Sequence, residues 1–258
     1  MTRPRIDLNG DVGESYGVYT LGHDERIIPS LSSVNVACGF HAGDPAVMRR
    51  TVRLALEHGV VVGAHPGFPD LVGFGRRSLG ASASEVEDLV LYQVGALAGI
   101  VAAEGGRLAH VKPHGALYNM AAADRVRADA VARAVASFDR QLILFGLAGS
   151  HLLDAGRDVG LRVAAEVFAD RAYDAEGCLV ERSVVGAVID DPAAVVARAT
   201  EMVLDGRVTA LTGETIHLTP DTLCVHGDTL GAVNLAAGIR TRLEASGVSV
   251  EALRLAAP

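Results

Sequence analysis

The chain has 258 residues, of which half are apolar and 21% are charged, so it has ample material for a buried core and no bias towards disorder. Its formal net charge is −8 with the acids spread along the chain, which argues against nucleic acid or an anionic membrane as the main partner and favours a small-molecule substrate. No segment approaches the roughly 20 apolar residues needed to cross a bilayer, so we expect a cytoplasmic protein.

Seven short β-prone runs, each stopping at Gly, Pro, Asp or His, are predicted as strands. In chain order they cover residues 6–11, 34–41, 60–65, 108–114, 141–146, 161–170 and 221–228. Residues 178–189 and 207–218 are less regular and favour a small excursion or hairpin before the last strand.

Helical patterns follow most of these strands. Asp44 and Pro45 provide an N-cap and a first-turn proline for a helix that should stop near Gly59. Ser84 and Glu87 have the spacing of a capping box, which would open a long helix ending by residue 105. Asp191-Pro192 and Gly206 bracket a further helix in the same way.

The repeated order strand, helix, strand implies parallel strands, either in an open doubly wound sheet or in a closed barrel. Side chains two residues apart on a strand share a face, so Asp7, Asn9 and Asp11 point together. Polar faces recur on five strands, and because unpaired buried charge is costly they should converge on one interior. We therefore predict an α/β fold with a distorted seven-stranded parallel β/α barrel, forming a single domain over residues 1–258.

The first two strands carry the first group of candidate site residues. Three carboxylates and one amide crowd the end of the first strand, and acids this close need a cation, a proton or a polar ligand to coexist. His41, at the mouth of the second strand, is placed to touch a ligand. The residues in question are Asp7, Asn9, Asp11, Glu14, Asn35 and His41.

The third and fourth strands each end at a histidine, His65 and His114. Lys112 beside His114 suits an oxyanion or phosphoryl-group stabiliser next to a general acid or base, although Lys112 could equally neutralise the interior acids. Tyr118 and Asn119 are expected in the first turn of the following helix, lining the same pocket.

The last two strands complete the set. Glu166 and Asp170 share a face beside Arg171, an arrangement suited to gripping an amino-acid carboxylate while an acid holds water or a proton. His226 ends the final strand, and Asp228 either orients His226 or caps the last helix.

Cofactors are less clearly indicated. Asp11, His41 and His65 could hold a catalytic divalent metal, but no local metal-ligand motif is present. The chain also lacks a G-x-x-x-x-G-K-[ST] phosphate loop, so any nucleotide is bound unconventionally or by a partner. Cys38, Cys178 and Cys224 are expected to be reduced thiols, with Cys38 and Cys224 in packing roles.

Six blocks of sequence, spread in order from residue 7 to residue 229, together resemble the LamB/YcsF family. The blocks are Asp7-Leu8-Asn9-x-Asp11-x-Gly13-Glu14, Asn35-x-Ala37-Cys38-Gly39-x-His41-Ala42-Gly43-Asp44, Gly63-Ala64-His65-Pro66, Val111-Lys112-Pro113-His114-Gly115-Ala116-Leu117-Tyr118-Asn119, Glu166-Val167-Phe168-Ala169-Asp170-Arg171 and Val225-His226-Gly227-Asp228-Thr229. The chain shows no departure at these positions.

The resemblance implies a barrel of the glycoside hydrolase/deacetylase type. It also implies the A subunit of an ATP-dependent 5-oxoprolinase, which acts with B and C subunits to hydrolyse 5-oxoproline to L-glutamate while ATP becomes ADP and phosphate. ATP would phosphorylate the stable lactam and make it electrophilic.

Roles within that reaction remain hypotheses. Asp11 or Glu166 would be the base for water, Lys112 would stabilise the oxygen or phosphoryl charge, and His41, His65 or His114 would protonate the ring nitrogen. Two alternatives stay open: a stand-alone metal-dependent deacetylase or amidohydrolase, and a non-catalytic substrate-binding subunit.

Overall fold

The computed structural model describes residues 3–226 and 231–255. Its centre is a closed, all-parallel barrel, because β1 pairs with β2 on one side and with β9 on the other. The barrel strands are β1 (Arg5–Val12), β2 (Ser33–Ala37), β3 (Val61–His65), β4 (His110–Val111), β5 (Ile143–Leu147), β6 (Arg162–Phe168) and β9 (Thr222–His226). The predicted seven-stranded parallel β/α barrel is confirmed.

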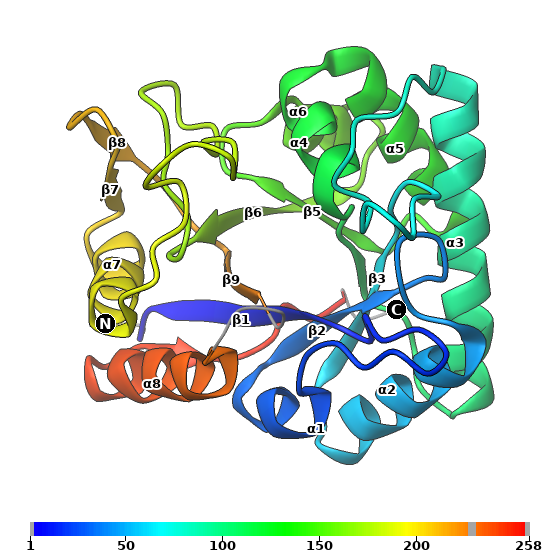
Figure 1. The fold of residues 1–258 in the computed structure, drawn as a ribbon, viewed down its shortest axis with the longest axis horizontal. Coiled ribbons are helices and arrows are strands. Elements are labelled where there is room, and N and C mark those ends of the chain that lie inside the picture. The colour runs from blue at the N-terminus through cyan, green and yellow to red at the C-terminus, as the bar shows by residue number, and fades with distance from the viewer. Residues whose placement is uncertain (1–2, 227–230, 256–258) are drawn as a thin grey trace.

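Helices lie around the outside of the strands (Figure 1). They are α1 (Asp24–Ile27), α2 (Pro45–Glu57), α3 (Ala83–Ala103), α4 (Gly115–Ala123), α5 (Arg125–Phe138), α6 (His151–Asp158), α7 (Pro192–Leu204) and α8 (Ala232–Ala245), with a 3₁₀ turn η1 (Ile28–Ser30) after α1. The expected hairpin forms from β7 (Arg207–Thr209) and β8 (Thr215–His217), and β10 (Ser249–Val250) pairs with the start of β1.

The barrel separates two kinds of side chain. Apolar residues of the strands, such as Leu8, Val34 and Val62, are buried beneath the helices. On β1 the alternate positions point inward and are polar, as predicted, whereas on β5 the inward positions Ile143 and Phe145 are apolar and Phe145 stacks on His110. Register brings them together: Asp11 lies opposite Asn35 on β2 and opposite His226 on β9. The polar interior therefore follows from the strand pattern and the closure of the sheet.

Strands β2 and β4 end three or more residues before their predicted ends. β2 ends at Ala37 rather than at His41, because Gly39 and Gly43 have φ values of 98° and 78°, which do not continue a strand. A Cβ atom on Gly43 would lie only 2.7 Å from the carbonyl oxygen of Ala37. β4 contains just two residues, since Pro113 cannot donate to the ladder and His114 already precedes α4.

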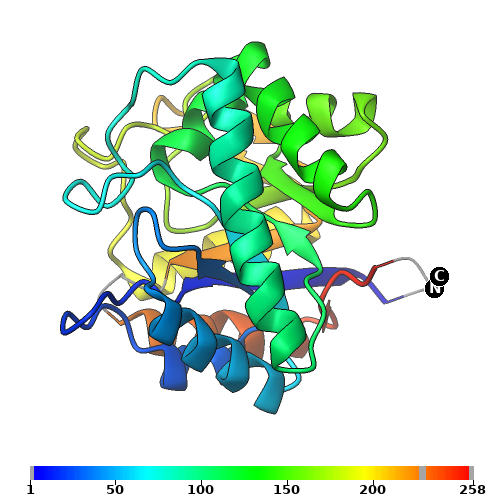
Figure 2. The same ribbon diagram turned by 90° about the vertical axis from the view of Figure 1, so that its right-hand side faces the viewer.

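Helix α3 differs from the sequence prediction in two ways. Its capping box is made by Ser82 and Glu85, not by Ser84 and Glu87, so the helix begins two residues earlier. It is also long and apolar enough, by length and composition, to cross a membrane, contrary to the expectation that no segment is. In this structure it runs along the outside of the barrel (Figure 2) and packs against α2, β3 and α5.

Candidate active site

The floor of the barrel is a hydrogen-bonded layer around Asp7. Its carboxylate accepts from the hydroxyls of Ser32 (2.7 Å), Ser33 (2.8 Å) and Thr222 (2.6 Å). Burial raises the pKa of Asp7 above its ordinary value, against the opposing effect of these hydrogen bonds. Asp7 does not line the barrel cavity, so its contacts are those of a structural support beneath the site.

Amide groups form the next layer. Asn9 Nδ2 donates to Glu166 Oε1 at 2.9 Å, and Asn35 Nδ2 donates to Asn9 Oδ1 at 2.7 Å and to Asp11 Oδ1 at 2.8 Å. His110 Nε2 lies 2.8 Å from Asn35 Oδ1. Asn9, Asn35 and Glu166 are fully buried and do not line the cavity. The amide of Asn9 holds the carboxylate of Glu166, and the amide of Asn35 holds that of Asp11.

Lys112 is the central cation of the site and the only lysine in the sequence. Its Nζ atom lies 3.0 Å from Asp11 Oδ1, 2.9 Å from Glu166 Oε1 and 2.9 Å from Cys224 Sγ. An ammonium group has three N–H bonds, which these three partners occupy, and Asn9 Oδ1 is a longer fourth neighbour at 3.4 Å. The arrangement favours the reading in which Lys112 neutralises the interior acids.

The charges in this cluster support one another. Burial would lower the pKa of Lys112, but Asp11, Cys224 and Glu166 together hold it well above its ordinary value. Burial would likewise raise the pKa of Asp11, but interactions with His65 and Lys112 outweigh it and hold that pKa well below normal. The thiol of Cys224 stays neutral because burial raises its pKa. The cluster is thus an ionised lysine between two acids, with a thiol as third acceptor.

Above this layer, four side chains converge at the ends of β1 to β4. They are Glu14, His41, His65 and His114, all buried, and their potential ligand atoms lie within 4.8 Å of one another. The rings of His41 and His114 stack with centroids 3.7 Å apart. Burial lowers the pKa of both imidazoles well below the ordinary value. The set suits a metal ion, and it differs from the predicted set in using Glu14 and His114 where Asp11 was expected.

The loop that covers these histidines depends on a glycine. Gly75 has a φ of 62°, and a Cβ atom there would lie 2.7 Å from His41 Cβ and 2.9 Å from His114 Cδ2. The preceding residue, Phe74, provides the carbonyl oxygen that lies 2.8 Å from His114 Nε2. The absence of a side chain at Gly75 lets this loop lie directly against the cluster.

His226 and Asp170 form a second pair at the mouth of the barrel. His226 Nδ1 lies 2.8 Å from Asp170 Oδ2, and the imidazole stacks on Phe168. Burial would raise the pKa of Asp170, but His226 outweighs it and lowers that pKa below its ordinary value. Asp228, predicted as a possible partner of His226, lies outside the described residues.

Arg171 has a different environment from the one expected for a carboxylate clamp. Its guanidinium is buried and donates to the carbonyl oxygens of Val180 (2.6 Å) and Ala187 (3.3 Å), bracing the loop before α7. Burial lowers the pKa of Arg171 to about 10, which still leaves it charged at neutral pH. Arg171 does line the cavity, together with Arg76 and Arg182.

A cavity of about 450 Å³ connects these groups. Asp11, Glu14, His65, Lys112, His114 and His226 line it, as do the predicted pocket residues Tyr118 and Asn119. Burial and the Glu166 carboxylate raise the pKa of the Tyr118 hydroxyl well above its ordinary value. Cys224 and His110 were not predicted as site residues, although the two-residue spacing of His110 and Lys112 on one strand signals a shared face.

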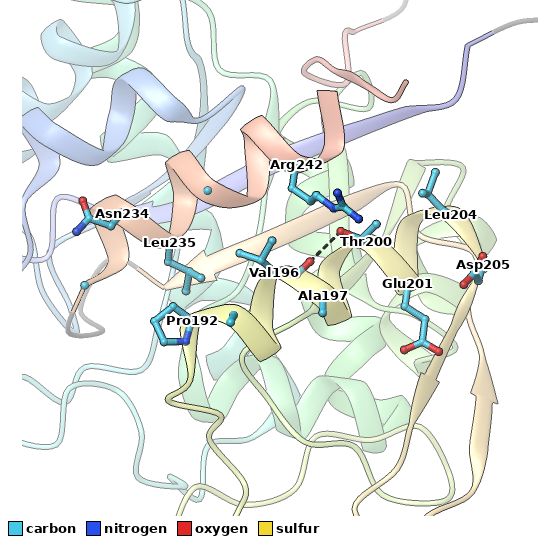
Figure 3. A pocket seen from close by; sticks show the side chains of 13 residues that line it. Pro192, Val196, Ala197, Thr200, Glu201, Leu204, Asp205, Asn234, Leu235 and Arg242 are labelled. Atoms are coloured by element: carbon cyan, nitrogen blue, oxygen red, sulfur yellow. Dashed lines mark hydrogen bonds between the residues drawn. The ribbon is translucent and has the colours of Figure 1, made fainter. Parts of the chain in front are cut away.

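A larger hollow of about 790 Å³ lies elsewhere, between α7 and α8 on the outer surface. Figure 3 shows its lining of Pro192, Val196, Ala197 and Leu235, with the Thr200 hydroxyl donating back to the Val196 carbonyl oxygen at 2.8 Å. It is mostly apolar and contains none of the clustered acids and histidines. This hollow therefore lacks the titratable groups that line the barrel cavity.

Comparison with known proteins agrees with this geometry. The model of the LamB/YcsF family matches residues 6–257. The chain belongs to the LamB/YcsF family. A relative from Symbiobacterium thermophilum, named as the A subunit of 5-oxoprolinase, is 58% identical, over 96% of this chain and 95% of its own.

Solved structures extend this LamB/YcsF assignment to the fold. A lactam utilization protein from Thermus thermophilus superposes with a TM-score of 0.91 at 51% identity, covering 96% of this chain and all of its own. A T48 deacetylase shares 14% identity and a TM-score of 0.50, over 96% of this chain and 87% of its own, and shows the fold alone. The expected deacetylase-type barrel is confirmed.

Proposed function

We propose that this LamB/YcsF chain opens the lactam ring of 5-oxoproline to give L-glutamate, as the A subunit of an ATP-dependent 5-oxoprolinase. The observation that carries the proposal is the Asp11–Lys112–Glu166 cluster at the base of a small polar cavity. A hydrolase for a cyclic amide needs a water-orienting acid, a cation near the carbonyl oxygen and a proton donor for the nitrogen. The relatives named as the A subunit of 5-oxoprolinase support the substrate assignment.

Between the two acids, Asp11 is the proposed base. It lines the cavity, whereas Glu166 is fully buried and its Oε1 atom already accepts from Asn9 and Lys112. A carboxylate whose pKa is held low is always ionised but weakly basic, so it can activate water only towards a strongly electrophilic carbon. Phosphorylation of the lactam oxygen by ATP would provide that electrophile.

Lys112 is the proposed partner of the lactam carbonyl oxygen. The hydrogen bonds that Lys112 donates to Asp11 and Glu166 are charge-assisted, while its third partner, Cys224, is a neutral thiol and a weak acceptor. A substrate oxygen could replace the sulfur without breaking either ion pair. In the absence of substrate, the Cys224 thiol would then accept the hydrogen bond that Lys112 donates to the substrate oxygen during the reaction.

His226, oriented by Asp170, is the proposed acid for the ring nitrogen. It lines the cavity and has a carboxylate on Nδ1, which fixes the orientation of the imidazole. Two of the histidines expected in this role, His65 and His114, instead direct ring nitrogens towards backbone carbonyl oxygens and towards each other. Arg171 and Arg182 supply positive charge along the wall for the α-carboxylate of the substrate.

The proposed reaction begins when ATP transfers its γ-phosphoryl group to the lactam oxygen and leaves as ADP. Water then adds to the adjacent carbon. The carbon–nitrogen bond breaks, His226 protonates the nitrogen, and γ-glutamyl phosphate forms. A second water hydrolyses this acyl phosphate to glutamate and inorganic phosphate. Each ring opened consumes one ATP and two waters.

ATP use and assembly with B and C subunits in the cytoplasm are part of the same proposal. Apolar side chains exposed beside the site support a partner surface: Tyr16, Tyr19, Leu71 and Val72 line a side pocket of about 540 Å³ that reaches Glu14 and His41. Val72 is 92% exposed, and exposed apolar patches of this kind often mark protein interfaces. We assign this rim to contact with one of the partner proteins.

The test is glutamate release from 5-oxoproline by the chain alone and mixed with purified B and C subunits, each with and without ATP. Glutamate formed only in the ATP-containing mixture supports the proposal.

The second candidate, a stand-alone metal-dependent deacetylase or amidohydrolase, is favoured by the Glu14–His41–His65–His114 cluster. It predicts amide hydrolysis by the isolated chain that ignores ATP and stops with EDTA.

A further inference from the structure

Hydrogen bonding to the backbone fixes the tautomers of two histidines beside the catalytic cluster. His65 Nδ1 lies 2.7 Å from the Lys112 carbonyl oxygen, and His114 Nε2 lies 2.8 Å from the Phe74 carbonyl oxygen. A carbonyl oxygen only accepts, so both of these nitrogens carry hydrogen. In a neutral imidazole the other nitrogen then carries a lone pair. His65 Nε2 and His114 Nδ1 are those nitrogens.

These two lone pairs face each other. His65 Nε2 and His114 Nδ1 are 3.0 Å apart, which is hydrogen-bond distance, but two neutral rings have no hydrogen to share there. Asp11 Oδ2 also lies 3.3 Å from His65 Nε2 and adds negative charge. The contact is repulsive unless a cation or an additional proton lies there.

Two further groups point at the same spot. Glu14 Oε1 lies 3.6 Å from His114 Nδ1 and 3.7 Å from His41 Nε2, both too long for a hydrogen bond. His41 is 1% exposed, and within the described residues neither of its ring nitrogens has a hydrogen-bond partner. A buried imidazole without partners is costly, so His41 also requires an occupant.

We propose that Glu14, His41, His65 and His114 bind a divalent transition-metal ion of the zinc type. Metal–ligand bonds of about 2.0–2.1 Å place neighbouring ligand atoms roughly 3.0–3.5 Å apart, and the shorter distances in the cluster fall in or near this range. Three imidazoles and one carboxylate favour zinc and its neighbours over magnesium or calcium. The carbonyl oxygens of Lys112 and Phe74 supply the outer hydrogen bonds that orient metal-binding histidines.

Glu14, His65 and His114 also line the catalytic cavity, so the ion would face the substrate. An ion of this class polarises a carbonyl or phosphoryl oxygen and makes water more acidic. That contribution to ring opening rests on the proposed function. Binding of the ion itself does not, and it is measured without any substrate.

The experiment equilibrates the full chain, purified without a metal-affinity tag, with zinc and then measures bound metal by mass spectrometry after dialysis. We expect about one ion per chain. Cobalt substitution should give the visible absorption of a nitrogen-rich, low-coordinate site, and crystals grown with zinc should show anomalous scattering between the four side chains. Chain that is folded by circular dichroism but retains no zinc or cobalt would overturn the proposal and leave a shared proton as the explanation.

Variants locate the ion. His41→Gln and His114→Gln should each lower zinc affinity at least about tenfold, whereas His151→Gln, an exposed histidine on α6, should leave it unchanged. Zinc retained equally by both cluster variants would place the ion elsewhere and contradict the assignment. The anomalous-scattering measurement decides the question without variants if either substitution prevents folding. Glutamate release is assayed separately, so failure of metal binding and failure of the proposed reaction are distinguishable.

Discussion

The Lys112 ammonium lies 2.9 Å from the Glu166 carboxylate, at the centre of a barrel where both side chains are almost completely excluded from solvent. The same nitrogen pairs with Asp11, so one cation compensates two buried acids. Removing it would leave Glu166 without its cation, and Asp11 with only the imidazole of His65, in a poorly solvated interior. The stability of the barrel and the proposed chemistry of its cavity therefore depend on the same residue.

Lys112→Met should lower the free energy of unfolding by about 3–5 kcal/mol, because the acids lose their buried partner. The matched control is Arg207→Met, which breaks a half-exposed pair with Glu201 and should cost at most about 1 kcal/mol. The sequence has no tryptophan, so urea unfolding is followed by far-ultraviolet circular dichroism. Equal losses in the two variants would contradict the charged, compensating role of Lys112.

Amine labelling tests the burial of Lys112 directly, since it is the only lysine. Its side chain is 3% exposed and its pKa is well above the ordinary value, so it presents no free amine to a reagent. A lysine-selective acylating reagent should modify only the N-terminal amine of the folded chain, and Lys112 after unfolding in urea. Rapid labelling of Lys112 in the folded chain would show an open or uncharged site.

Asp170 should make stability depend on pH in acid. Its folded-state pKa is lowered below the ordinary 3.8, mainly by His226 acting against burial, so the unfolded chain binds the proton more tightly. The contribution of Asp170 is then present above about pH 4 and is lost as the pH falls through the folded-state value. Urea unfolding of wild type and Asp170→Asn should differ at about pH 5 and converge as the pH falls below about 4. A difference that grows on acidification would reverse the assigned shift.

The start of α3 distinguishes two neighbouring serines. Ser82→Ala removes the side chain that accepts from Glu85 N and should cost about 1 kcal/mol. Ser84→Ala, two residues further on and also exposed, should cost less than about 0.5 kcal/mol. Urea midpoints that rank the two variants in the opposite order would restore the capping box expected from the sequence.

The residue at which α3 begins could not be predicted from the sequence alone. Ser82 and Ser84 both precede an acid by three residues, so spacing alone permits either box. In the folded chain the box of Ser82 and Glu85 forms both of its hydrogen bonds. The early end of β2 has a similar origin, because Gly39 and Gly43 can adopt extended or left-handed conformations and only the folded loop fixes which.

The alternation of polar residues along β1 was sufficient to predict a polar barrel interior, since strand geometry leaves no other place for Asp7, Asn9 and Asp11. Which partner each acid finds could not be predicted in the same way. Lys112 reaches Glu166 and Cys224 on distant strands, and Asp170 reaches His226 from another strand end. These contacts depend on register and on barrel closure, which local sequence does not encode.

The most direct test of the account is glutamate release by the 5-oxoprolinase assembled from B and C subunits and the Asp11→Asn chain. If Asp11 activates the attacking water, turnover should fall at least about 100-fold, because amide nitrogen cannot accept a proton. Asp88→Asn, which changes a solvent-accessible acid on α3, is the control and should keep full activity. Near-normal ATP-dependent turnover by a folded Asp11→Asn chain would contradict the assignment of this cluster as the catalytic centre.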